Sequence, residues 1–236
     1  GSVQNFLFGT SSTGGQTTLE FNDTTWDAGV WTHLAAVRSS GTLKMYVNGV
    51  ADGTTSTAVS GNLTDLEYIG TGRNFTDDVR IFNGKVSNVR FSSTARYTSN
   101  FTPPTAAFAT DSDTNLLTCQ SNRFVDNSSN GHTVTPNAVA DTYTNLATVT
   151  AFGPFLTDAV YDPAVNGASV YLDGSGDGSS GGTVRVSSPP SAFGASDWTY
   201  EAWLYMVSNA YLVSIFGQGP GDESTVSGLR VSNNNL

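Results

Sequence analysis

Hydrophobic and polar residues alternate with a period of two along most of this chain. Between residues 42 and 48, for example, every second position is apolar: Leu43, Met45 and Val47. This alternation is typical of a β-strand with one buried face. The dipeptide Asn48-Gly49 follows, and it predicts a hairpin because both central residues of a type I′ turn need a positive φ.

Two segments are apolar on both faces and read as central strands of a covered sheet. One is Trp31–Arg38. The other is Trp198–Met206, in which alternate residues from Trp198 form one face, with Trp203 and Tyr205 on the other. Further strands are predicted at Phe6–Phe8, Thr17–Phe21, Leu66–Ile69, Val86–Phe91, Val170–Leu172, Val184–Val186 and Leu212–Phe216. No window of about a dozen residues has a clean helical period, so the sequence predicts an all-β fold.

The predicted strands fall into two dense groups, 1–108 and 168–236. The region between them, 109–167, is rich in Asp, Asn, Thr and Pro but contains short apolar pieces such as Leu116-Leu117 and Phe124-Val125. Because those pieces recur at intervals, we expect 109–167 to be an ordered connector that docks on a core.

Composition restricts the partners of the chain. Its 236 residues include 20 acidic and 10 basic ones, which gives a formal net charge of −10. Nucleic acids and anionic membranes are bound mainly through Lys and Arg, so neither is an expected partner. With one Cys no disulfide can form within the chain. No apolar run approaches about 18 residues, so we expect neither a membrane span nor a leader in this stretch.

Several of these segments resemble a known family. Residues 31–38 and 43–49 resemble the central hairpin of laminin-G-like domains, which belong, with the pentraxins, to the concanavalin A-like lectin/glucanase superfamily. Residues 84–91 resemble the strand that closes such a domain, and 169–174 with 197–203 resemble the strands that open one. Parts of 97–128 are similar to connectors in repetitive surface proteins of marine phages and bacteria. The resemblance implies an antiparallel jelly-roll β-sandwich.

The order of these segments departs from the family pattern. The opening strands lie in 168–236 and the closing strands in 1–108, so the domain is either circularly permuted or cut from a tandem repeat. We therefore interpret 1–108 as the C-terminal half of a sandwich and 168–236 as its N-terminal half. Half a sandwich leaves an apolar face uncovered, so the two should complete one sandwich, within the chain or between copies.

Enzymes must be considered because the superfamily includes glucan hydrolases. Retaining hydrolases need two carboxylates about 5 Å apart, and laminarinase-type members carry them as Glu-x-Asp-x-x-Glu. None of the glutamates in this chain begins that pattern: Glu20, Glu67, Glu201 and Glu223. Glu201 lies in an otherwise apolar strand and is expected to be a paired carboxylate or to lie at a sheet rim. We predict that the chain is not an enzyme.

Other catalytic and zinc chemistry has little support. Cys119 has no candidate base besides His33 and His132, and two His with one Cys cannot form the usual four-ligand zinc site. His33 is expected to be a core or hydrogen-bonded histidine, and His132 a loop residue.

Calcium is the candidate cofactor, because it binds carboxylate and carbonyl oxygens on turns. Asp173, Ser175 and Asp177 place oxygen atoms at alternate positions before a glycine, as an EF-like loop begins. A flexible Gly/Ser hairpin loop is the alternative, since no Glu occupies the bidentate position. Asp78 is a second candidate ligand, with a solvated side chain as its alternative. The resemblance also implies calcium, which laminin-G-like domains often carry on a rim loop.

Carbohydrate binding would use an exposed aromatic ring with fixed polar groups nearby. Trp26 lies in a polar loop and is the candidate platform; its alternative is a packing residue at the sandwich edge. Asn74 and Asp77 are the candidate polar partners on a second loop. The other three tryptophans lie on predicted strands and are expected in the core: Trp31, Trp198 and Trp203.

Together these observations predict a non-enzymatic adhesion or recognition module of a repetitive extracellular, cell-surface or virion-surface protein. Its expected ligand is a glycan or a cell-surface receptor. The alternative is a structural repeat or filament subunit, in which copies assemble head to tail by strand complementation.

Overall fold

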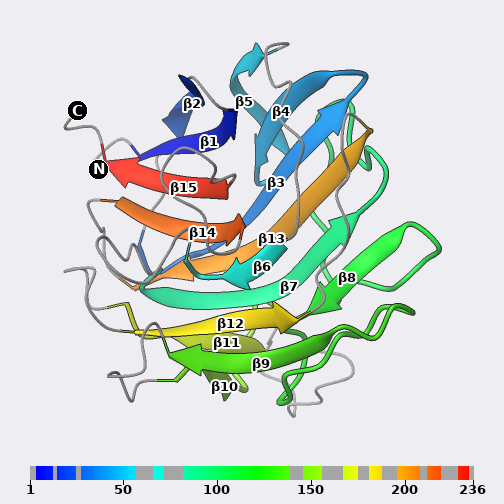
Figure 1. Cartoon of the computed structure of the whole chain (residues 1–236), viewed down its shortest axis with the longest axis vertical. Helices are drawn as coiled ribbons and strands as arrows, with labels where there is room; N and C mark the ends of the chain where they lie inside the picture. Colours follow the sequence, from blue (N-terminus) through cyan, green and yellow to red (C-terminus); the bar gives the residue numbers. More distant parts are fainter. Residues whose placement is uncertain are drawn as a thin grey trace.

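Two antiparallel β-sheets packed face to face make up this chain (Figure 1). The computed structural model describes residues 4–12, 15–24, 28–56, 66–71, 82–138, 146–155, 167–174, 181–187, 196–207, 212–218 and 228–233. Every regular element in these ranges is a β-strand, which confirms the predicted all-β sandwich. Within the same ranges we find no helix long and apolar enough to cross a membrane.

The first sheet, sheet A, has seven strands. Their order is β2 (Gly15–Thr24), β1 (Gln4–Ser12), β15 (Gly228–Asn233), β14 (Leu212–Gln218), β6 (Leu66–Ile69), β12 (Gly182–Ser187) and β9 (Thr133–Ala138). The second sheet, sheet B, has eight. Its order is β10 (Thr148–Thr150), β11 (Ser169–Leu172), β7 (Gly84–Ser92), β13 (Trp198–Met206), β3 (Trp31–Ser39), β4 (Thr42–Val47) and β5 (Val50–Ser56), with β8 (Thr114–Thr118) also paired to β7. Each strand predicted from alternation lies in one of them.

The predicted hairpin turn is present between β4 and β5. Asn48 and Gly49 both have positive φ, 49° and 79°, and Val47 pairs with Val50 across the turn. Gly49 is also required by crowding, since a Cβ placed there would lie 1.9 Å from the backbone oxygen of Phe101. The turn residues therefore adopt the backbone conformation that the twist of the two strands requires, and Gly49 leaves room for the backbone of Phe101.

Strands from both ends of the chain lie side by side in both sheets. In sheet B, β13 lies between β7 and β3, so that Trp203 is paired with Ser87 on one side and with His33 on the other. In sheet A, β1 pairs with β15. Residues 1–108 and 168–236 thus contribute to one sandwich within this chain. The permuted order and the boundaries of the two halves stay predictions.

The region expected to be a connector contributes strands of its own. β9 and β10 occupy one edge of sheet A and of sheet B, respectively, and β8 pairs with β7. Leu116 and Cys119 are buried in the core cluster, as are Val134 and Ala147. The apolar pieces of 109–167 therefore do more than cover a finished core, because they extend the sheets.

The core lies between the two sheets and draws on both. Tyr200 of β13 packs on Phe216 of β14 with ring centroids 4.0 Å apart, and Trp198 is fully buried. The prediction of a core position is confirmed for Trp198 and wrong for Trp31 and Trp203, which are half-buried. These two share the strand parity of His33 and Glu201, and their side chains lie on the face of sheet B that points away from sheet A.

That outer face of sheet B is partly covered by residues 93–113, which connect β7 to β8 and which we call the strap. Tyr97 and Phe101 of the strap stack with ring centroids 3.5 Å apart. With Ala95, they pack on a small buried cluster that comprises Ala35, Val37 and Tyr46. The strap therefore closes part of this face with a second, smaller apolar layer.

Candidate functional site

Most of the residues predicted to bind ligand or metal lie outside the described residues: Trp26, Asn74, Asp77, Asp78, Ser175 and Asp177. Asp173 is described, half-buried just after β11. Across the described ranges, no group of three or more His, Cys, Asp or Glu could hold a metal ion. The calcium loops and the Trp26 platform therefore stay predictions.

A buried ionic cluster lies between the strap and sheet B, centred on Glu201 of β13. The Glu201 side chain is fully buried, and its Oε1 accepts a hydrogen bond from Nε of Arg90 at 2.8 Å. A second guanidinium nitrogen of Arg90 lies 2.7 Å from the same oxygen. The other carboxylate oxygen, Oε2, accepts from the Tyr97 hydroxyl at 2.8 Å and lies 3.3 Å from His33 Nε2. The predictions of a paired carboxylate and a hydrogen-bonded histidine are confirmed.

The electrostatics of the cluster favour an ionised Glu201. Burial alone would raise its pKa, but the hydrogen bond from His33 and the charge of Arg90 outweigh that effect and hold the pKa below its ordinary value. Burial and the Glu201 charge together raise the pKa of Tyr97. Tyr97 therefore stays a hydroxyl donor while Glu201 stays an acceptor.

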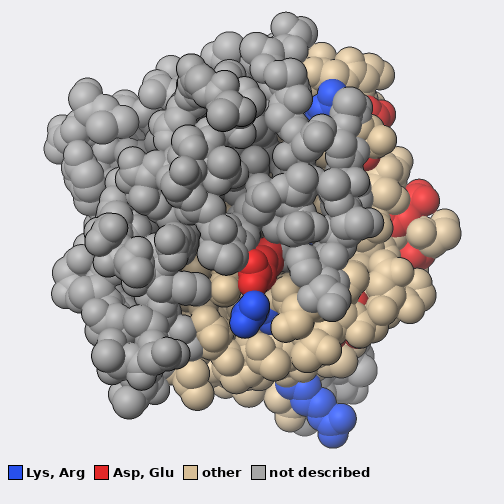
Figure 2. Space-filling model, viewed as in Figure 1, with Lys and Arg blue, Asp and Glu red and all other residues tan. Residues whose placement is uncertain are grey.

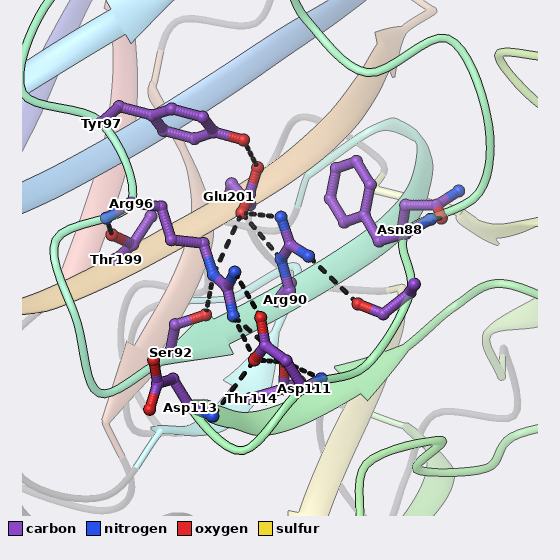
Figure 3. Close-up of polar contacts among 12 residues, drawn as sticks. Asn88, Arg90, Ser92, Arg96, Tyr97, Asp111, Asp113, Thr114, Thr199 and Glu201 are labelled. Carbon is purple, nitrogen blue, oxygen red and sulfur yellow. Dashed lines mark hydrogen bonds and ion pairs between the residues drawn. The ribbon is translucent and has the colours of Figure 1, made fainter.

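A second ion pair lies within the strap beside this cluster, and its arginine also contacts sheet B (Figure 3). Arg96 donates to both carboxylate oxygens of Asp111, at 2.8 and 2.7 Å. The Arg96 backbone N–H donates to Thr199 Oγ1 of β13 at 2.9 Å. Hydrogen bonds from Arg96 hold the pKa of Asp111 below its ordinary value, although partial burial opposes them. Together with the hydrogen bond from Tyr97 to Glu201, the contact from the Arg96 backbone to Thr199 anchors the strap on β13.

This arrangement is structural rather than catalytic. Both oxygens of Glu201 are engaged by Arg90, Tyr97 and His33, and the carboxylate has no exposed surface. A sugar ring could reach it only if the strap left the sheet. The nucleophile and acid of a retaining hydrolase must both contact the substrate, so Glu201 fits neither role.

A different part of the outer face of sheet B is open to solvent. Four residues on adjacent strands are direct cross-strand neighbours there, and we call them the outer row: Tyr171 of β11, Lys85 of β7, Tyr205 of β13 and Trp31 of β3. Phe152, just after β10, packs on this row. Its ring centroid lies 5.7 Å from that of Trp31 and 5.2 Å from that of Tyr205.

The outer row is partly accessible and carries one charge. All four of its side chains are half-buried, whereas Phe152 is 39% exposed. Val30, just before β3, and Val207, just after β13, are 53% and 47% exposed. The Lys85 ammonium lies 4.9 to 5.4 Å from the ring centroids of Tyr205, Phe152 and Tyr171. This combination of rings and one polar head is typical of ligand-contacting surfaces.

Basic groups are sparse on the surface seen in Figure 2. On the described part of that face, the Lys and Arg side chains lie apart from one another, some of them beside acidic side chains, and they form no continuous positive patch. This agrees with the low content of basic residues. The absence of a nucleic-acid partner stays a prediction.

Comparison with protein families assigns part of the chain. Residues 2–100 match a laminin-G family model described as "Concanavalin A-like lectin/glucanases superfamily". This segment, which is less than half of the chain, is similar to that superfamily. No curated protein and no solved structure matched the chain.

The concanavalin A-like match includes the β3–β4 hairpin that carried the resemblance, together with Trp31 and Lys85. Tyr205, Tyr171 and Phe152 lie beyond the matched residues. The superfamily fits a carbohydrate-binding or adhesion module. The outer row was missed by sequence reasoning, although alternation had already put Tyr205 on the face opposite Trp198.

Proposed function

We propose that this chain is a non-enzymatic carbohydrate-recognition module of an extracellular or virion-surface protein. The observation that carries the proposal is the outer row with Phe152: three aromatic rings and one lysine on four adjacent strands of a concanavalin A-like sandwich, with a more exposed ring packed on them. Rings on strands are held rigidly, so a ligand that stacks on them loses little affinity to the ordering of the protein.

Two further observations support recognition rather than hydrolysis or self-assembly. Glu201 is sequestered by Arg90 and Tyr97 under the strap, which argues against a hydrolase. Strand complementation between copies was considered because half a sandwich would leave strands unpaired. β13 and β15 pair with β3 and β1 of the same chain, so they need no strand from another copy. The acidic surface suits a protein that stays soluble outside the cell.

A calcium ion bound by the loop that begins at Asp173 belongs to the same proposal, since such an ion could order a rim near β11. Calorimetric titration with calcium tests it. Heat release with a rise in melting temperature is the expected result, and the absence of both would remove calcium from the proposal.

The experiment that tests recognition is a glycan array probed with the wild-type chain and with two variants. Phe152→Ala removes an exposed ring of the proposed site, and Val125→Ala removes a similarly exposed apolar side chain outside the proposed site. We expect saccharide binding that weakens in Phe152→Ala and is unchanged in Val125→Ala. An array on which the wild-type chain retains no saccharide would contradict the proposal.

A further inference from the structure

We infer that the outer row selects anionic saccharides and that Lys85 recognises the acid group; this inference rests on the carbohydrate recognition proposed above. The ligand class is a saccharide with an isolated carboxylate or sulfate group next to an apolar sugar face. The inference depends on how Lys85 is held, on what surrounds it and on the charge of the whole chain.

Lys85 has no anionic partner among the described residues, unlike three of the arginines. Arg90 pairs with Glu201, Arg96 with Asp111 and Arg185 with Glu67. For Lys85, within the part of the chain that the structure describes, the contacts of the ammonium are with three aromatic rings. Its N–H groups are therefore available to a ligand oxygen.

The rings place that ammonium in a fixed setting. Tyr171 and Tyr205 are its direct register neighbours on either side, and the Phe152 centroid lies 5.2 Å from Nζ. Ring faces attract a cation and limit its motion, so the side chain loses less entropy when a ligand binds. A sugar whose apolar face stacks on Phe152 or Tyr205 would bring its own substituents toward Lys85.

Polar groups around Lys85 agree with an acidic ligand. The Tyr205 hydroxyl makes no hydrogen bond within the described residues, so it can donate to the same acid group as Lys85. Asp173 lies close enough to Tyr171 for its charge to act on that ring. We therefore place the ligand's acid group on the Tyr205 side of Lys85, away from Asp173.

The charge of the chain limits the ligand further. A formal net charge of −10 repels a densely charged polymer. One ammonium can offset one acid group at short range, because attraction between exposed charges is screened beyond about 8 Å at physiological ionic strength. Oligosaccharides with isolated acid groups should therefore bind, whereas dense polyanions such as heparin or nucleic acid should not.

The test compares acidic saccharides with neutral partners of the same backbone by calorimetry. Oligogalacturonate and its methyl ester share one backbone, but the ester has lost the carboxylate charge and gained a methyl group. Sulfated and unsulfated galactan oligomers supply the sulfate arm. We expect the wild-type chain to bind at least one acidic form about tenfold more tightly than its neutral partner, as one charge-assisted hydrogen bond implies. Whichever acidic form binds identifies the acid group.

Variants assign the preference to Lys85. Lys85→Met should remove the acidic preference and leave neutral binding, whereas Lys85→Arg should keep much of it. Lys44→Met is the matched control: Lys44 lies on β4 and donates to the Thr98 carbonyl at 3.2 Å, so its loss changes the net charge equally without touching the outer row. If Lys85→Met does not fold, the wild-type chain can be titrated with the acidic oligomer and followed by NMR. Shifts of the ring protons of Tyr171 and Tyr205 are then expected, and their absence would show that the oligomer does not bind at Lys85.

The outcomes separate the two proposals. Equal affinity for acidic and neutral forms, or an acidic preference that survives in Lys85→Met, would overturn the role of Lys85 while carbohydrate recognition stands. Tighter binding of heparin than of any oligosaccharide would overturn the inference as well. If no saccharide binds, the proposed function fails, and this inference fails with it.

Discussion

Replacing the carboxylate at the centre of the buried cluster tests whether it holds the strap on sheet B. Glu201→Gln keeps the size of the side chain but removes its charge and leaves one oxygen to serve several donors. In the native chain those donors are two guanidinium nitrogens of Arg90, the Tyr97 hydroxyl and His33, at 2.7 to 3.3 Å. Arg90 would keep its stacking on Phe108, with its guanidinium carbon 4.5 Å from the ring centroid, but not its counter-charge.

The expected loss is large because the cluster is closed to water. Breaking one partner of a buried ion pair typically costs about 3–5 kcal/mol, most of it from the charge left behind. For a chain of this size 1 kcal/mol lowers the melting temperature by about 2–4 °C, so we expect a fall of roughly 6–20 °C. Urea unfolding followed by tryptophan fluorescence measures the free energy. Hydrogen exchange of residues 93–113 shows whether the strap opens first.

A surface pair provides the control. Glu67 accepts from Arg185 on sheet A at 3.0 Å, with 47% of the arginine side chain exposed. Glu67→Gln removes one charge in the same way, yet exposed pairs contribute about 1 kcal/mol or less. If Glu201→Gln destabilised the chain no more than Glu67→Gln, the buried cluster would not anchor the strap, and the structural role assigned to it here would be refuted.

Three further predictions follow from the same structure. The pKa values of Glu201 and Asp111 are lowered in the folded chain, so the stability these carboxylates contribute is fully present above their ordinary pKa values of 4.5 and 3.8. It is lost as pH falls through their pKa values in the folded chain. The free energy of unfolding measured from pH 6 to pH 2 should show this loss, and the loss should be smaller in Glu201→Gln. Burial raises the pKa of the Cys119 thiol to about 12, so a thiol reagent at pH 8 should label it only in urea, and rapid labelling of the native chain would contradict this. Gly49→Ala should destabilise the chain much more than Gly131→Ala. Both glycines have positive φ, but a Cβ at Gly49 would lie 1.9 Å from a strap carbonyl oxygen, whereas a Cβ at Gly131 would have nothing within 4 Å. Equal losses of unfolding free energy in chemical denaturation would contradict the steric explanation.

Strand positions and facing could be predicted because alternation is a local property. Parity placed Trp198 and Tyr200 on the same face of their strand, and both are buried in the core. Asn48-Gly49 marked its turn by conformation alone. Trp31 shows where that reasoning fails. A bulky aromatic in an apolar strand suggested the core, but in a sheet covered on both sides either parity can be apolar, so hydrophobicity did not identify the inner face.

Partnerships across the sheets could not be predicted. Glu201 was expected to be paired, but Arg90 and His33 lie 111 and 168 residues away in the chain, and only the pairing of β13 with β7 and β3 brings them together. The outer row could not be predicted for the same reason, because Tyr171 and Lys85 become neighbours only through the pairing of β11 with β7. The strap has no periodic pattern, so nothing local marked it as a cover for sheet B.

The central place of β13 also bears on how the chain acquires its fold during synthesis. β3 and β7 are made early, yet neither can reach its final neighbour until Trp198–Met206 has been translated. Contacts so distant in sequence slow folding, and until they form, the apolar strands on both sides stay open to wrong pairing. Ribosome-bound chains that stop before residue 198 should therefore bind chaperones strongly, and chains that extend past β13 should release them.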